Sequence, residues 1–148
     1  MADAIEVRTI TLDAAKRVAE ASVAAAADQG AAIVAVVLNA FGQIVVVHRM
    51  DNVVELALEN ATAKANAALT FKRSTRALSD YFHEDDSLGP PMTSRSSILA
   101  VEGGELLTSA DGTVIGAVGV SGSKHVIDHA IAMAGVEALS GPAGTNGG

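Results

Sequence analysis

The spacing of apolar residues predicts a helix near the start of the chain, over residues 12–28. Thr11 precedes it and carries a hydroxyl that can cap free N–H groups, and Gly30 follows it as a helix stop. The apolar positions recur at helical intervals, at Leu12, Ala15, Val18, Ala19, Val23 and Ala26.

Runs of β-branched residues between turn residues predict two hairpins and one additional short strand. Asn39 to Gly42 forms the first turn, and Asp111-Gly112 is a strong two-residue hairpin signal for the second. The predicted strands are residues 33–38, 43–49, 98–101, 105–109 and 113–120.

Two further helical regions complete the pattern. One runs from residue 55 to residue 82, with a break near Ser74 and a cap from Asp51 or Asn52, and the other ends at Leu139. The fold class is therefore α/β (α+β), a two-layer domain with a central, mainly antiparallel five-stranded sheet and helices packed on it. Residues 1–139 form this single domain, and residues 140–148 are a flexible tail by composition.

Composition narrows the functional classes. The formal net charge of −7 and the absence of a basic patch argue against nucleic acid. The chain has no cysteine, no apolar run long enough to cross a membrane and no signal-peptide pattern, so we expect a cytoplasmic protein. Aromatic residues are only 3% of a chain rich in alanine and valine, and such flat faces favour burial in a homo-oligomer.

The candidate chemistry lies where the last strand turns into the last helix. His125 and His129 are four residues apart and share a helix face, and Asp128 is adjacent. The two imidazoles could ligate haem or a metal ion, or one could act as a general base. Alternatively, Asp128 caps or pairs locally and both histidines are solvated.

The turn before this helix reads Gly119-Val120-Ser121-Gly122, and its backbone N–H groups could bind a carboxylate or an oxyanion. The alternative is a tight turn that needs glycine for its geometry. Neither a phosphate-binding loop nor a nucleophile elbow fits the spacing, so Ser121 is not predicted as a nucleophile.

Other candidates are spread along the chain. Lys64, in an alanine-rich helix, is either an activated amine or the partner of an acid such as Glu59, Glu55 or Asp51. Arg49 with Asp51, and Arg95, could hold a carboxylated ligand or form ordinary surface pairs. His83 begins an acidic loop that is either solvated or a lid over the site.

Several segments share a pattern with a known family. They are the Leu12-led first helix, His48-Arg49-Met50-Asp51 at the hairpin end, Ala63 to Ala68, Glu102-Gly103-Gly104, and Asp111 to Gly122 followed by Asp128. This set resembles the GlcG/HbpS family, which includes the C-terminal domain of PduO-type proteins. The resemblance implies a profilin-like fold, a homo-oligomer of two subunits up to an octamer and, for some members, haem binding or degradation.

The chain also departs from that family. Asn52 stands where relatives usually have glycine, and His125 and His129 flank Asp128 where relatives tend to carry acids. The first helix has no histidine like the one the PduO-type domains look to use for haem. Glu55 and Glu59 do not clearly reproduce a carboxylate pair proposed for iron in some relatives.

Three functions follow as alternatives. The first is a haem-associated small-ligand protein with His125, His129 or His83 as the axial ligand. The second is a cofactor-independent isomerase or lyase that moves a proton on a small carboxylated molecule. The third is a non-catalytic binding partner of a metabolic enzyme.

Overall fold

The computed structural model describes residues 1–85, 87, 89 and 97–140. Its helices and strands are α1 (Leu12–Asp28), β1 (Val34–Asn39), β2 (Ile44–Arg49), α2 (Leu56–Phe71), α3 (Thr75–Glu84), β3 (Gly104–Thr108), β4 (Val114–Ser121) and α5 (His125–Ser140). The predicted tail lies outside the described residues from position 141 onward.

The described part of the chain forms one antiparallel sheet with the strand order β2-β1-β4-β3. The predicted antiparallel sheet is thus confirmed, but it has four strands rather than five. Residues 98–101 do not form a strand because they pair with a helix: the Leu99 N–H donates to the Ala63 carbonyl of α2 at 3.2 Å. Ile98 and Ala100 pack beside Phe82 of α3.

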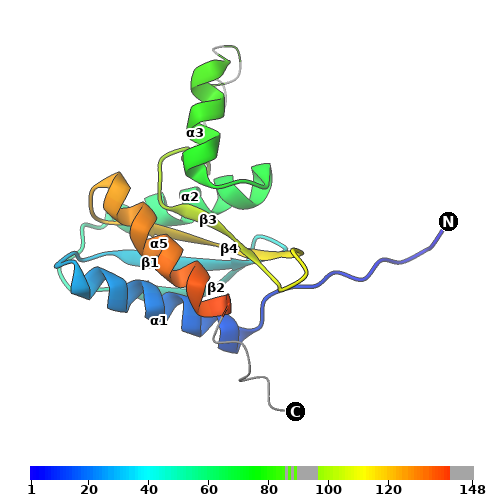
Figure 1. The fold of residues 1–148 in the computed structure, drawn as a ribbon, viewed down its shortest axis with the longest axis horizontal. Coiled ribbons are helices and arrows are strands. Elements are labelled where there is room, and N and C mark those ends of the chain that lie inside the picture. The colour runs from blue at the N-terminus through cyan, green and yellow to red at the C-terminus, as the bar shows by residue number, and fades with distance from the viewer. Residues whose placement is uncertain (86, 88, 90–96, 141–148) are drawn as a thin grey trace.

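Helices cover both faces of the sheet, which gives three layers where two were predicted (Figure 1). The reason lies in β1, which is apolar at nearly every position and therefore needs cover on both faces. Ala35 and Val37 of β1 face α1 and α5, whereas Val34, Val36 and Leu38 face α2.

The helix α2 packs very closely on β4. A Cβ built on Gly119 of β4 would lie 1.9 Å from the Ala61 carbonyl oxygen of α2, so glycine is required there. Alanines at the buried positions of α2 permit the same approach. This contact fixes the position of Lys64, which α2 directs towards the end of β4.

The predicted helix start at Thr11 and the predicted break near Ser74 are confirmed, and the start of α2 is shifted. The Thr11 and Ser74 hydroxyls each accept a backbone N–H at 3.1 Å and cap α1 and α3. The helix α2 begins at Leu56 without a side-chain cap; Asp51 and Asn52, predicted as its cap, lie in the preceding turn. Figure 1 shows α3 projecting away from the sheet.

Candidate functional site

A buried ion pair joins α2 to α5. The Lys64 ammonium nitrogen lies 3.0 Å from Asp128 Oδ2, and both side chains are nearly inaccessible, at 4% and 3% exposure. Lys64 Nζ also donates to the Val120 carbonyl at 2.9 Å, and the Ser123 N–H donates to Asp128 Oδ1 at 3.0 Å. Lys64 therefore pairs with an acid as predicted, but the acid is Asp128, 64 positions away along the chain.

Burial opposes the charged forms of both partners. It lowers the pKa of Lys64 and raises the pKa of Asp128, while the attraction between the two groups acts in the opposite sense. The Val120 carbonyl and the Ser123 N–H compensate part of the lost hydration. The charged pair is thus buried from solvent next to the first turn of α5.

A second acid–base contact lies beside this pair. His129 Nδ1 of α5 is 3.0 Å from Glu105 Oε1 of β3. Both atoms are buried, and neither has a well-aligned hydrogen-bond partner among the described residues. Burial raises the pKa of Glu105 to about 7 and lowers the pKa of His129. Burial therefore favours the neutral form of each group.

Charged groups at the rim complete the arrangement. Arg76 of α3 donates to Glu102 at 3.1 Å, and this hydrogen bond lowers the pKa of Glu102, with a smaller contribution from the positive charge of His125. His125 itself is exposed at the start of α5. We call the whole set the α5 corner cluster, and its members are Lys64, Arg76, Glu102, Glu105, His125, Asp128 and His129.

Gly103 and Gly104, at the start of β3, allow this strand to pack closely against Lys64 and Val120. A Cβ on Gly103 would lie 2.6 Å from the Val120 carbonyl oxygen and 3.1 Å from Lys64 Nζ. One on Gly104 would lie 2.4 Å from the Lys64 carbonyl oxygen. The Glu102-Gly103-Gly104 segment therefore allows the start of β3 to pack directly against Lys64. The acids on either side of the two glycines, Glu102 and Glu105, belong to the α5 corner cluster.

The predicted anion-binding turn uses its polar groups internally. The Val120 N–H donates to the Gly103 carbonyl at 2.8 Å, and Ser121 is buried at the end of β4. Gly119 packs against α2, and a Cβ on Gly122 would lie 2.5 Å from the Ala32 carbonyl oxygen. These contacts favour the tight-turn alternative, and the ligand role of Gly119, Val120, Ser121 and Gly122 stays a prediction.

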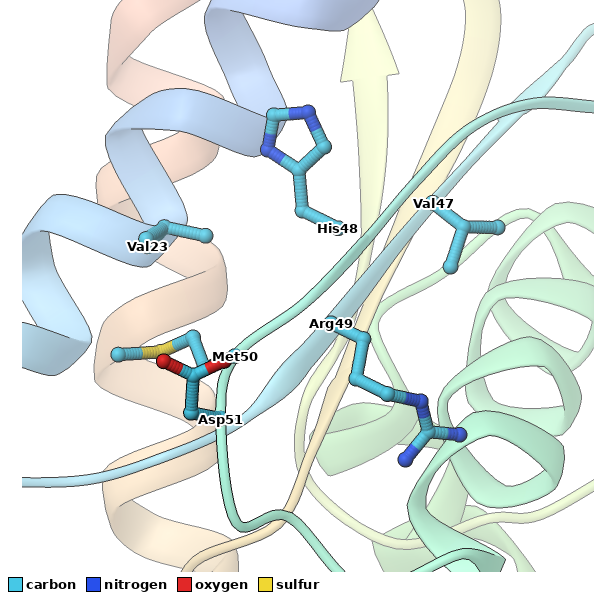
Figure 2. A pocket seen from close by; sticks show the side chains of 6 residues that line it. All are labelled: Val23, Val47, His48, Arg49, Met50 and Asp51. Atoms are coloured by element: carbon cyan, nitrogen blue, oxygen red, sulfur yellow. The ribbon is translucent and has the colours of Figure 1, made fainter.

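A different hollow lies at the end of β2 (Figure 2). It has a volume of about 520 Å³ and is lined by Val23, Val47, His48, Arg49, Met50 and Asp51. Figure 2 shows the His48 ring and the Arg49 guanidinium on opposite sides of the strand. Arg49 also lines a neighbouring hollow of about 640 Å³ together with Glu55, Leu56, Leu58 and Glu59.

The structure thus divides the predicted residues between two places. Lys64, Asp128 and His129 meet in the α5 corner cluster with His125 at its edge, whereas Arg49 and Asp51 belong to the hollow at β2. His83 is exposed on α3, with its Nδ1 2.7 Å from the Ser79 carbonyl oxygen. Arg95 lies outside the described residues.

Sequence reasoning missed Glu105 and Arg76, and it did not single out His48 as a site residue. The available signal for Glu105 was an acid inside an apolar strand, a position that burial makes costly unless it is used. For His48, the period-two alternation of β2 places its side chain on the face towards α1, opposite Arg49.

Two features bear on the metal and membrane predictions. Within the described ranges, no three His, Cys, Asp or Glu side chains gather as a metal site, so His125 and His129 have no third protein ligand of these types there. None of the helices in the same ranges has the length and apolar character needed to span a bilayer.

Comparisons with known proteins agree with this fold. The family model described as "Haem degrading protein HbpS-like" matches residues 10–137. An uncharacterized 15.0 kDa protein from the dhaT-dhaS intergenic region of Citrobacter freundii is 32% identical over 136 residues, covering 91% of this chain and 95% of that protein.

Two solved structures share the architecture. The crystal structure of HbpS superposes with a TM-score of 0.84 at 26% identity and covers 93% of this chain and 94% of its own. A PduOC complex with haem superposes with a TM-score of 0.80 at 25% identity, covering 88% and 95% respectively. Because the family model matches residues 10–137, most of the chain, the chain belongs to the HbpS-like family.

Proposed function

We propose that this chain binds haem in the hollow at the end of β2, with His48 as the iron ligand. The observation that carries the proposal is an imidazole in a hollow of about 520 Å³, a volume typical of small-molecule sites. The PduOC relative, whose structure contains haem, adds support at the level of the family.

The residues of this hollow fit the chemistry of haem. Haem needs an axial ligand, apolar walls for the porphyrin and cations for the propionates. His48 makes no hydrogen bond to a described residue, so its ring nitrogens are free. Val23 supplies apolar surface on the His48 side of the strand (Figure 2). Val47 and Arg49 line the hollow from the opposite side; Arg49 forms no ion pair with a described residue and could meet a propionate at the strand end.

The other histidines offer weaker positions. His83 already contacts the Ser79 carbonyl, and His129 has Nδ1 against Glu105. His125 is exposed at the start of α5. His125, His129 and His83 therefore remain the alternative ligands from the sequence, and His48 is the stronger candidate.

The test is a haem titration of the purified protein followed by its Soret absorption. His48→Ala should weaken haem binding at least tenfold and change the position of the band, whereas a His125→Ala, His129→Ala double variant should behave like the parent. Loss of the band in the double variant, with His48→Ala unaffected, would instead assign the iron to α5. A parent protein that gives no saturable band would contradict haem binding itself.

A second candidate function is proton transfer on a small carboxylated molecule without a cofactor. It is favoured by the α5 corner cluster, where seven ionisable groups meet and several pKa values depart from their usual range. His129 would move the proton, and Lys64 with Asp128 would hold the corner in place. The test is deuterium incorporation into the methyl group of pyruvate in D2O, with His129→Gln expected to abolish any catalysed exchange.

We also propose that the protein forms a homo-oligomer through the α2-side surface near β2. Its exposed aliphatic side chains include Ile44, Val54, Leu56 and Leu58, with exposures of 54%, 68%, 58% and 37%. The helix α2 packs on β4, β3 and β1 and leaves this edge of the sheet uncovered. Exposed aliphatic side chains on an uncovered sheet edge favour burial against a second copy of the chain.

A further inference from the structure

We propose that Glu105 and His129 share one proton and act together as the acid–base pair of the α5 corner cluster. This inference rests on the second candidate function, proton transfer, and adds to it a residue, Glu105, that the sequence did not indicate. It is independent of haem binding at His48, because neither Glu105 nor His129 lines the hollow at β2.

The geometry isolates these two groups from other partners. Glu105 Oε1 and His129 Nδ1 are 3.0 Å apart, and both atoms are buried. Since neither atom has an aligned hydrogen-bond partner among the described residues, each is the nearest available source or acceptor of a proton for the other. Glu105 is 8% exposed overall, so ionising it without a proton on His129 would leave an uncompensated buried charge.

Burial and two neighbouring charges act on both groups. Burial, the largest influence, raises the pKa of Glu105 and lowers that of His129, so it favours the neutral form of each. Arg76 favours the ionised form of Glu105 and the neutral form of His129, while Glu102 acts in the opposite sense on both.

The His129 ring is 18% exposed although Nδ1 is buried, so the accessible part of the ring lies away from Glu105. In the proposed reaction Nε2 is the nitrogen that meets the substrate. The chemistry fits a carbon acid that carries a carboxylate, such as a 2-oxo acid, whose anion would compete with Glu102 for Arg76 at the rim. The reactive form has Glu105 ionised and His129 neutral with its proton on Nδ1. When the C–H bond breaks, its electron pair forms an enolate, the proton binds Nε2, and the Nδ1 proton passes to Glu105.

The first experiment is a site-resolved NMR titration of the His129 ring nitrogens in the intact protein. The parent should show a biphasic curve because Glu105 titrates in the same range. Glu105→Gln should remove one of the two steps and leave a single-phase curve, because an amide does not ionise. Glu102→Gln is the matched control and should keep both steps. A single-step parent curve, or a biphasic curve that persists in Glu105→Gln, would overturn the shared proton.

The second experiment tests the catalytic role, with pyruvate in D2O as the probe. Glu105→Gln should retain folded structure by circular dichroism and shift the pH dependence of methyl exchange, whereas His129→Gln should remove the exchange. If the parent catalyses no exchange, the acid–base role and the proton-transfer function are rejected for 2-oxo acids. The NMR titration would still decide independently whether Glu105 and His129 share a proton. Exchange with an unaltered pH profile in Glu105→Gln would assign the chemistry to His129 without Glu105.

Discussion

Lys64 Nζ lies 3.0 Å from Asp128 Oδ2, in a position where water reaches neither side chain. The pair connects α2 on one face of the sheet to α5 on the other, across the end of β4. It thereby fixes the first turn of α5, the segment that presents His125 and His129. A structural ion pair at this point thus controls the geometry of the neighbouring acid–base contact.

Removing one member of this pair should be much more costly than removing both. Lys64→Met leaves the Asp128 carboxylate buried without its cation, and Asp128→Asn does the reverse, so each should lower the free energy of unfolding by about 3–5 kcal/mol. The double variant Lys64→Met, Asp128→Asn should lose less than the sum of the single changes. Urea unfolding of all four proteins measures this difference, and additive losses would contradict the pairing.

Stability should fall as pH rises through neutrality because of Glu105. Burial raises its pKa from 4.5 to about 7, so the folded protein retains this proton between those values while the unfolded chain has lost it. The resulting stabilisation is complete below about pH 4.5 and is lost as pH rises through about 7. His129, with its lowered pKa, has its effect below about pH 6.5, outside this upper range.

The measurement is the urea midpoint between pH 6.5 and pH 8.5. The parent should lose stability over this interval, and Glu105→Gln should lose clearly less because an amide does not ionise. Glu102→Gln, at the rim, serves as the control with the same charge change. Equal slopes in the parent and Glu105→Gln would show that Glu105 does not titrate in this range.

Gly119→Ala should disrupt the packing of α2 on β4. The added methyl would lie 1.9 Å from the Ala61 carbonyl oxygen, and backbone rather than a flexible side chain would have to move. Overpacking typically costs about 1–3 kcal/mol, and we expect the upper end or more here. Thermal unfolding compares this variant with Ala24→Gly, an exposed helical change that should cost about 1 kcal/mol. A stability equal to that of the parent would mean that the helix does not approach this closely.

Charge on the exposed aliphatic surface should reduce the oligomer. Leu56→Glu combined with Leu58→Glu places two carboxylates on the proposed interface and should yield a lower mass by size-exclusion chromatography with light scattering. Leu12→Glu changes another exposed leucine, on α1, and should leave the mass unchanged. A parent that is monomeric at micromolar concentration would contradict the oligomer, and an unchanged mass in the double variant would place the interface elsewhere.

Local sequence signals determined most of the secondary structure. Thr11 and Ser74 mark their helix starts because a hydroxyl before a helix satisfies N–H groups of the first turn, and Asp111-Gly112 gives its hairpin because these residues suit the turn. The continuous apolar run of β1 also signalled a strand buried on both faces. Local signals did not determine the number of strands. The segment Ile98 to Val101 is short and apolar like a strand, but its backbone hydrogen bond from Leu99 goes to Ala63 of α2 and not to the sheet.

The sequence alone indicated the candidate site residues of α5. Only the tertiary structure showed which residues from other elements lie beside them. Helical spacing places His125, Asp128 and His129 within one turn, a relationship of four residues or fewer. It cannot say that α2 brings Lys64 to Asp128, that β3 brings Glu105 to His129, or that β2 and α1 leave a hollow at His48. These contacts depend on how closely the helices pack on the sheet. That distance is determined together by small residues, glycines and alanines, from segments that are distant in the sequence.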